Sequence, residues 1–385
     1  MLLRKQVDRL LRGFERGFAT HNRIEVSGEA LRHNLALFQR LTHKQVIPVL
    51  KGNAYGHGVA QVAQALKHSS VPYIAVDGYF EALRVREVSS QPVLVMGAIL
   101  PENFARMKYD NFAFVVQDEM TIRGLAATGK DINVHLEYNT GMNRYGANLT
   151  ELENLLRLIG YHKNLRLEGF MSHLADSDAD SPDNVHAAVA RFDEGVELVH
   201  KAGFRPHYIH VAQSAGSLRA ESAYANAIRL GIGLYGLNPF DKQHPLSRSL
   251  ESLRPSLRFV STITKVIPLA KGDHVGYGYT FTAPKPMRIG VIPAGYYEGV
   301  NRALSNVGVV QVAGQLAPIV GRVCMNHTMI SLEHIPAAKV GDDVLVYSDQ
   351  PQDENAFDAI AAKHHLFNYN LLTALSPDVR RQLIS

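Results

Sequence analysis

Lys51 ends an apolar run rich in β-branched residues, in the segment VIPVLKGNAYGHG (46–58), and leads into a loop of Gly, Asn, Tyr and His. A lysine buried at the end of such a run is costly unless it is paired, has a lowered pKa, or is used covalently as an imine. Pairing with an acid such as Glu137 is the plain structural alternative, and the segment alone leaves both interpretations open. Lys51 is therefore a candidate for covalent or acid–base chemistry.

Other polar residues stand at matching places later in the chain, each at the end of an apolar, β-rich run. They are Glu137 with Arg144 in the following loop, His173, Ser214, and Arg229 with Gly231. If these runs are parallel strands of one barrel, their carboxyl ends meet and the polar side chains converge with Lys51.

The elements that must position these residues alternate regularly. Eight β-rich runs occur at 45–51, 73–78, 93–98, 112–117, 132–138, 167–173, 207–214 and 228–236. Most are separated by stretches with amphipathic helical spacing, and the last long one closes at Gly203, a suitable helix-ending residue. This alternation predicts an α/β fold, a (β/α)8 TIM-like barrel, rather than an open doubly wound sheet.

After about residue 250 the pattern changes to short strands separated by Gly, Pro and Asp, with helical spacing again only near DAIAAKHHLFNYNLLTAL (358–375). We therefore expect a barrel domain over 23–250 and a mainly β C-terminal domain over 251–385. The segment NRIEVSG (22–28) is also strand-like and could pair with either domain.

The first 22 residues form a separate segment, predicted to be an amphipathic helical extension. This segment lacks the continuous apolar stretch of a signal peptide, and no later segment is apolar enough to span a bilayer, so we expect a cytoplasmic protein without a membrane span.

Composition narrows the classes of function. The chain has 385 residues, 46% of them apolar, and a formal net charge of +4 with basic and acidic residues intermixed, so nucleic acid is not an expected partner. The single Cys324 excludes an intramolecular disulfide. Among 18 histidines there is no HxH or HExxH spacing, so no metal site is expected.

A series of motifs carries a more specific signal. VLKGNAYGHG (49–58) is followed in order by NTGMNRYG (139–146), SHLADSD (172–178), QSAGS (213–217), RLGIGLYG (229–236), GYGYTF (276–281), PAGYYEG (293–299), VGRVCMNHTMI (320–330) and NYNLLTAL (368–375). From about Arg23 to its end the chain resembles the alanine racemase family, whose members use pyridoxal phosphate (PLP).

The resemblance implies a role for each matching residue. Lys51 would hold PLP and serve as one of two bases, and Tyr277 would serve the opposite face of the substrate, assisted by His173 with Arg229 behind it. Arg229 would face the pyridine nitrogen and, because a guanidinium only donates, leave that nitrogen largely unprotonated and limit side reactions. The expected phosphate contacts are Tyr55, Ser214, Gly231, Ile232 and Tyr369.

The same resemblance implies a shared site. Arg144 would contact PLP and the substrate carboxylate, while Met325 and Tyr277 would reach the substrate from a partner subunit, which requires a head-to-tail homodimer. The matches to residues of the substrate corridor are Asp178, Tyr296, Arg302 and Arg322.

The sequence departs from the family pattern at several positions. Many members carry a lysine carbamylated by CO2 seven residues before the matching arginine, where this chain has Glu137, a shorter anion that could orient Arg144. The other departures are Asn139 for Asp, Gln213 for Asn, Asn326 for Asp and Asn370 for Glu, and together they leave strict alanine specificity open.

The expected function is interconversion of L- and D-alanine by the two bases, supplying D-alanine for peptidoglycan. Alternatives are a racemase of another small amino acid such as serine, a related decarboxylase, and a non-catalytic PLP-binding barrel. Non-catalytic PLP-binding barrel proteins lack a β domain, which this chain is expected to have. A decarboxylase would use a cysteine-containing loop, and an acidic residue in place of Arg229.

Overall fold

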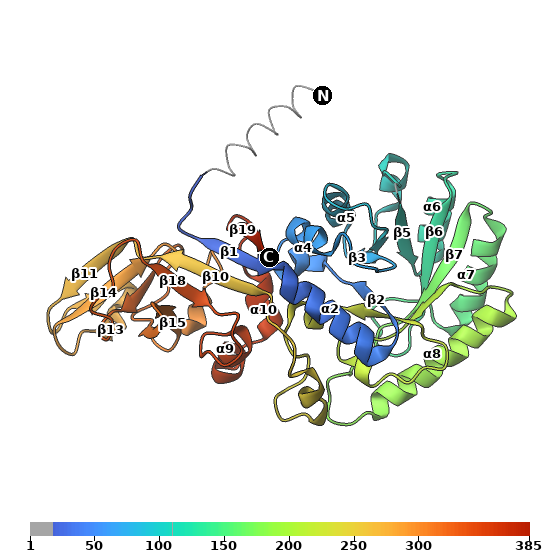
Figure 1. Ribbon diagram of the computed structural model, residues 1–385. Helices are drawn as coiled ribbons and strands as arrows, with labels where there is room; N and C mark the ends of the chain where they lie inside the picture. Colours follow the sequence, from blue (N-terminus) through green and yellow to red (C-terminus); the bar gives the residue numbers. More distant parts are fainter. Residues whose placement is uncertain (1–17, 110) are drawn as a thin grey trace, which may run out of the picture.

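The computed structural model describes residues 18–109 and 111–385. The predicted helix of the N-terminal extension falls on residues 1–17, which lie outside the described residues. Only residues 18–22 of the extension are described. Within the described ranges, no helix combines the length and apolarity needed to cross a bilayer. Figure 1 shows two parts side by side, an α/β part and a mainly β part.

The α/β part is a barrel of eight parallel strands in the order β2-β9-β8-β7-β6-β5-β4-β3. A bridge between Val49 and Ala75 closes the sheet, and the N–H of Leu50 donates to the Ala75 carbonyl at 2.7 Å. The strands are β2 (Gln45–Pro48), β3 (Ile74–Val76), β4 (Val93–Val95), β5 (Phe112–Val116), β6 (Ile132–Glu137), β7 (Leu165–Met171), β8 (Tyr208–His210) and β9 (Ala227–Leu230). All eight predicted strands are present, and the predicted fold class is confirmed.

Helices and short 3-10 turns connect these strands. They are α2 (Gly28–Thr42), α3 (Lys51–Tyr55), α4 (Val59–Leu66), α5 (Tyr79–Arg86), η1 (Pro101–Arg106), α6 (Glu119–Ala126), α7 (Leu149–Tyr161), α8 (Asp183–Lys201), η2 (Gly216–Leu218), η3 (Ile232–Tyr235) and η4 (Pro245–Leu250).

Local sequence explains several helix ends. Ser27 caps α2 by accepting from the Ala30 N–H, and Asn148 with Glu151 forms a capping box at the start of α7. Gly203, with φ of 86°, follows the end of α8 as predicted.

Several predicted strands end earlier than expected, and two of these ends lead into Lys51 and Gly231 of the candidate site. The run 45–51 stops at Pro48, so Lys51 begins α3, and the run 228–236 stops at Leu230 and continues as η3. Gly236 explains the second difference, because its φ is 84° and a Cβ there would lie 1.9 Å from the Arg254 carbonyl oxygen.

The mainly β part contains three sheets. β1 (Arg23–Ser27) joins it, because β1 pairs antiparallel with β10 and parallel with β19, which settles the partner of the NRIEVSG segment. The other strands are β10 (Leu257–Thr262), β11 (Lys265–Leu269), β12 (His274–Val275), β13 (Phe281–Thr282), β14 (Met287–Ile292), β15 (Val309–Val312), β16 (Gln315–Pro318), β17 (Thr328–Ser331), β18 (Asp343–Tyr347) and β19 (Arg380–Ile384).

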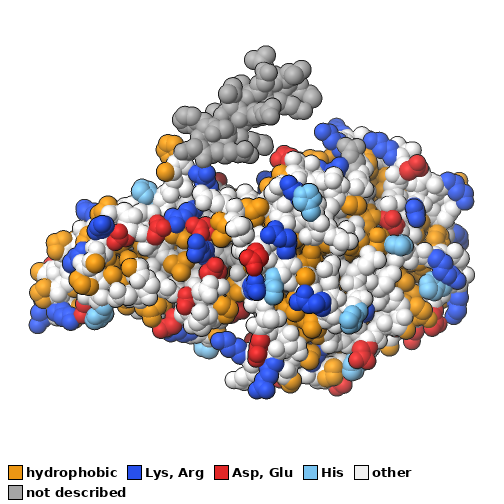
Figure 2. All heavy atoms as spheres, viewed as in Figure 1, with side chains coloured by type: hydrophobic (Ala, Val, Ile, Leu, Met, Phe, Trp, Pro, Cys, Tyr) orange, Lys and Arg blue, Asp and Glu red, His pale blue; other side chains and the backbone are white. Residues whose placement is uncertain are grey.

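The sheet orders are β16-β15-β18-β10-β1-β19, β11-β14-β17 and β12-β13. Helical structure returns near the chain's end, as expected. The remaining helices and 3-10 turns are η5 (Tyr277–Tyr279), η6 (Arg302–Leu304), α9 (Phe357–His364) and α10 (Asn368–Thr373). On the face shown in Figure 2, basic and acidic side chains are interspersed over both parts.

Candidate active site

Lys51 opens a backbone turn of left-handed geometry. Gly52, Asn53 and Ala54 have φ of 63°, 54° and 54°, and Tyr55 continues with 50°. Such angles cost an L-residue roughly 1–2 kcal/mol each, and strain of this kind persists where the surrounding structure fixes it. A strained turn at this place is therefore consistent with a functional role for the side chains that it positions.

Contacts from three sides hold this turn. The Asn53 N–H donates to Glu81 Oε1 at 3.2 Å, and its side-chain Oδ1 accepts from the Val59 N–H at 3.2 Å. A Cβ on Gly56 would lie 2.0 Å from the Leu372 carbonyl oxygen, so only glycine allows α10 to pack there. These contacts fix Lys51 and Tyr55 at the two ends of one rigid turn.

Tyr55, Ser214 and Gly231 form a cradle for an anion. Ser214 Oγ accepts from the N–H groups of Gly231 and Gly233, both at 3.2 Å, which leaves its own proton available to a ligand. A Cβ on Gly231 would lie 2.7 Å from the Tyr55 hydroxyl, so the absent side chain keeps this space clear. The Tyr369 ring lies 6.0 Å from that of Tyr55, centroid to centroid.

This cradle has hydroxyl donors of the kind that a phosphate requires, and Ile232, which begins η3, adds a backbone N–H beside it. Four of the five residues expected to contact phosphate thus come from three segments, which follow β2, β8 and β9, and Tyr369 comes from α10.

Arg229 is the most heavily bonded side chain at this end of the barrel and is 2% exposed. Its Nη1 donates to His210 Nδ1 at 2.7 Å and to the His210 carbonyl at 3.0 Å. Its Nη2 donates to the carbonyls of Ser172 and Val211 at 2.6 and 3.1 Å and to His173 Nδ1 at 3.2 Å. Burial lowers the pKa of Arg229 to about 10, and nearby Glu137 opposes this shift.

These bonds fix the tautomers of the histidines. A guanidinium only donates, so Nδ1 of His173 and of His210 must accept, and the proton of each neutral ring lies on Nε2. His210 Nε2 lies 2.9 Å from His135 Nδ1, so that proton is donated to His135. Burial, followed by the charge of Arg229, holds the pKa of His173 well below its usual value.

Lys51 lies within reach of the charges of this group. Burial lowers its pKa; the carboxylate of Asp77 acts in the opposite direction, and the guanidinium groups of Arg144 and Arg229 lower it further. A lysine in these surroundings has a larger neutral fraction near neutral pH than a surface lysine. Its amine is thus better suited to act as a nucleophile or a base.

Glu137 and Arg144 line one small hollow together with His173. Burial raises the pKa of the Glu137 carboxyl, while Arg229 and then Arg144 oppose the shift. Among the described residues no hydrogen bond or ion pair joins Glu137 to Arg144. The attraction between them therefore acts through space in this structure.

Tyr277 and Met325 stand apart from the barrel residues. Tyr277 begins η5 and Met325 lies in a loop, both in the mainly β part, and they are 70% and 54% exposed. The loop of Met325 is fixed, because its carbonyl accepts from the Tyr297 N–H at 2.9 Å and the Asn326 side chain donates to Glu298 Oε1 at 2.8 Å. Within one chain both side chains are thus largely open to solvent.

The corridor residues and the remaining departures occupy polar loops. Tyr296 is 43% exposed, Arg302 and Arg322 are exposed, and Asp178 lies beside Tyr369 in the wall of one groove. Asn139 accepts from the N–H groups of Gly141 and Asn143, so it shapes the loop that carries Arg144. Gln213 donates to Ser177 Oγ at 3.0 Å, whereas no contact of Asn370 explains its departure from the pattern.

Sequence reasoning missed His135, His210 and Glu298. His135 stands two positions before Glu137 on β6, on the inward side of the barrel, and His210 is the last residue of β8. Polar residues at inward positions of otherwise apolar strands were the available signal. Glu298 gave no such signal, because it acts by accepting a hydrogen bond from Asn326, in a loop distant in sequence.

Comparisons with known proteins agree with this arrangement. Residues 26–239 match the family model described as alanine racemase, N-terminal domain, and residues 256–383 match the C-terminal domain model. The chain is 34% identical to the alanine racemase of Sorangium cellulosum, covering 93% of this chain and 98% of that protein. It is 32% identical to alanine racemase 2 of Caldanaerobacter subterraneus, covering 93% and 94%. The solved structure of the alanine racemase from Bacillus anthracis superposes with a TM-score of 0.86 at 27% identity, covering 96% of each chain.

Proposed function

The chain belongs to the alanine racemase family, and on that basis we propose that it is an isomerase that interconverts L- and D-alanine with PLP held by Lys51. The observation that carries the proposal is the convergence of Lys51, Arg229 and His173 beside an anion cradle. The lowered pKa of Lys51 suits an amine that must be neutral to react, and the cradle of Tyr55, Ser214 and Gly231 fits a phosphate.

PLP, when bound, supplies an electron sink that makes the proton on the substrate's Cα acidic. The chain's own residues supply the rest. Arg144 binds the substrate carboxylate, and Lys51 exchanges a proton with one face of Cα. Arg229 would face the pyridine nitrogen of the bound cofactor as a hydrogen-bond donor and, as a guanidinium, would give that nitrogen no proton at neutral pH.

The opposite face of Cα requires a second acid–base group. The Tyr277 hydroxyl can serve as this group. His173 can assist it through Nε2, because Nδ1 of His173 already accepts a hydrogen bond from Arg229. Since Tyr277 and Met325 are exposed on their own chain, we assign them to the site of a second copy. A head-to-tail homodimer would thus carry two shared sites.

A direct test uses purified protein loaded with PLP and incubated with L-alanine in D2O. We expect D-alanine to appear together with deuterium at Cα, and L-serine tested in parallel measures the substrate range. Exchange without inversion would contradict the two-base assignment, and no exchange with any small amino acid would overturn the proposed function.

The shared site has its own test. We expect the Lys51→Ala protein to be inactive and the Tyr277→Phe protein to be weakly active, but a mixture allowed to exchange subunits contains heterodimers with one intact site. Because half of the dimers are then mixed and each has one good site, the mixture should recover roughly a quarter of wild-type activity. If each chain used its own Tyr277, mixing would recover nothing.

A further inference from the structure

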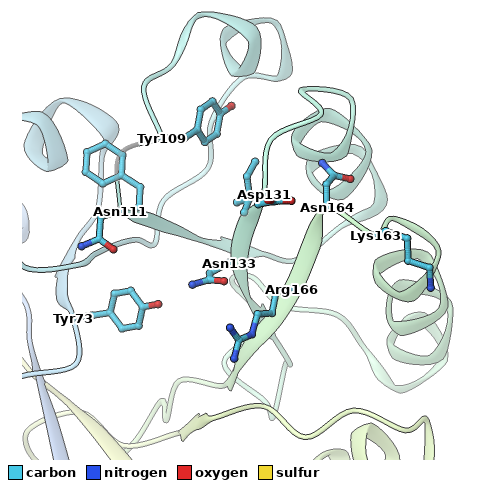
Figure 3. A pocket seen from close by; sticks show the side chains of 10 residues that line it. Tyr73, Tyr109, Asn111, Asp131, Asn133, Lys163, Asn164 and Arg166 are labelled. Carbon is cyan, nitrogen blue, oxygen red and sulfur yellow. The ribbon is translucent and has the colours of Figure 1, made fainter.

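The barrel has a second hollow at the end opposite to the candidate active site. It has a volume of about 460 Å³ and is shown in Figure 3. Its walls are residues before, or among the first two positions of, β3, β5, β6 and β7, whose other ends point towards Lys51. The hollow falls in the range of about 300–1,000 Å³ that is usual for small-molecule sites.

The described residues in the walls of this hollow are polar and carry more positive than negative charge. The charged ones among them are Arg166, Lys163 and Asp131, and Tyr73 and Asn133 add polar groups. Among the described residues Arg166 makes no hydrogen bond or ion pair, and Lys163 has only a long bond of 3.4 Å to the Gly160 carbonyl. In Figure 3 the side chains of Arg166, Asn133 and Tyr73 face a common space.

A free guanidinium beside an amide group is suited to a carboxylate or a phosphate, which accept hydrogen bonds from both; the hydroxyls of Tyr73 and Tyr109 already donate to Glu168 and to the Phe104 carbonyl. The aromatic rings of Tyr73, Tyr109 and Phe112 add apolar surface for the carbon part of a ligand. The hollow thus fits an organic anion better than an uncharged or cationic molecule.

A column of polar side chains leads from this hollow towards Arg229. Tyr73 donates to Glu168, and its ring stands edge-on against the ring of His135 at 5.3 Å between centroids. His135 bonds His210, which accepts from Arg229. Apolar branched side chains usually fill such a barrel, and buried polar groups are costly unless they are satisfied.

One residue of this column, His135, has a ring nitrogen without a hydrogen-bond partner. His135 is completely buried, and its Nε2 has no hydrogen-bond partner in the structure. Because Nδ1 accepts from His210, Nε2 carries the proton and is an unsatisfied donor. A movement of Tyr73 or Asn133 at the hollow would change the surroundings of His135, and through His210 the contacts of Arg229.

We propose that this hollow binds a small organic anion, a carboxylate or a phosphate ester, with Arg166 as its charged anchor, and that the bound anion alters catalysis through His135, His210 and Arg229. The catalytic half of the proposal rests on the proposed function. The binding half does not, because it is measured without substrate.

Binding is tested by isothermal titration calorimetry on the PLP-loaded protein, with succinate and glycerol 3-phosphate as separate probes at constant ionic strength. Saturable binding of either probe supports the site and identifies carboxylate or phosphate as the preferred group. Arg166→Gln should weaken that binding about tenfold or more, as expected for a charge-assisted contact. Arg248→Gln, which removes an exposed charge on η4, should leave binding unchanged.

Absence of saturable binding to both probes, or equal binding by wild type and Arg166→Gln, would overturn the site. Coupling is tested by alanine racemisation with and without the probe that binds. We expect kcat or KM to change at least twofold in wild type and to stay constant in Arg166→Gln. Binding with unchanged kinetics would overturn the coupling alone, and a protein that binds the probe but racemises nothing would overturn the proposed function alone.

Discussion

Arg229 donates a hydrogen bond to Nδ1 of His173 at 3.2 Å, and this contact determines which nitrogen of His173 carries the proton. The arginine is itself held by bonds to two histidine rings and three backbone carbonyls from β7, β8 and their loops. A lysine at this buried position could not replace the arginine, because it has fewer hydrogen-bond donors and lacks the planar arrangement of the guanidinium. One residue of β9 therefore sets the protonation pattern of the barrel's polar interior.

The first prediction concerns this residue. Arg229→Lys should lower the free energy of unfolding by about 3 kcal/mol, because three ammonium donors leave buried acceptors unpaired at about 1–3 kcal/mol each. Urea unfolding of the PLP-free protein measures the loss. Arg258→Lys, at a partly exposed pair with Glu25, should cost less than about 1 kcal/mol. Equal losses in the two variants would contradict the role of the Arg229 network.

Lys51→Ala should abolish the visible absorbance band of lysine-bound PLP and all racemisation, because no other described residue presents an amine beside the cradle. Lys67→Ala, an exposed lysine that ends α4, is the control and should keep both. A band retained in the Lys51 variant after dialysis would show that a different lysine holds the cofactor.

The barrel could be predicted because its evidence is local. Each strand is a short apolar run between turn residues, and each long helix has its own amphipathic spacing and caps, as in α7 with Asn148 and Glu151. The strand ends near Lys51 and Gly231 were placed too late, because the left-handed turn and η3 are imposed by contacts with α10 and the Arg254 backbone, which are distant in sequence.

The candidate site was predictable in part for the same reason. Lys51, His173 and Ser214 follow strands and Arg229 lies near the end of β9, so the barrel topology alone brings them together. The inward positions of His135 and His210 left a signal in the sequence, but the contact between their rings did not, since it depends on a bulge between Val134 and His135 and on the space left by Gly169. A Cβ on Gly169 would lie 2.1 Å from His135 Nδ1.

Tyr277→Phe should affect the two directions of the reaction differently. The variant loses the acid–base group for one face of Cα while Lys51 still serves the other, so proton abstraction from L-alanine should slow more than abstraction from D-alanine. Isotope effects with Cα-deuterated substrate in each direction measure this. Tyr279→Phe is the matched control from the same turn and is equally exposed. Equal isotope effects in both directions would remove Tyr277 from its role.

Glu137 should also leave a signature in the pH dependence of stability. Its folded-state pKa is raised by burial, so the native state binds more protons than the unfolded chain between pH 4.5 and that raised value. Stability from this group is therefore lost as the pH rises through this window. The Glu137→Gln variant has no carboxyl to ionise and lacks this pH-dependent loss. Its free energy of unfolding, measured with urea, should therefore rise relative to that of wild type between pH 4 and pH 7. A constant difference would show that the Glu137 carboxyl titrates normally.

The final prediction concerns what Glu137 does for Arg144. If its carboxylate serves as the anion that a carbamylated lysine supplies in other members of the family, activity should be indifferent to added or depleted CO2. Glu137→Gln keeps the size and removes the charge, so the substrate carboxylate should be held less well. Because no direct bond joins Glu137 to Arg144 in this structure, we expect a loss near the low end for a charge-assisted contact, on the order of 1.5 kcal/mol or about tenfold in kcat/KM.

Two further variants make this assignment specific. Glu137→Lys should be poor at ambient CO2 and partly rescued by bicarbonate, because carbamylation would restore an anion at the same place. Glu153→Gln, on the exposed face of α7, should behave as wild type at every CO2 level. If Glu137→Gln turns over alanine at the parent rate, the carboxylate does not orient Arg144. The neighbouring Asn139, whose side chain already shapes the Arg144 loop, would then be the residue that positions it.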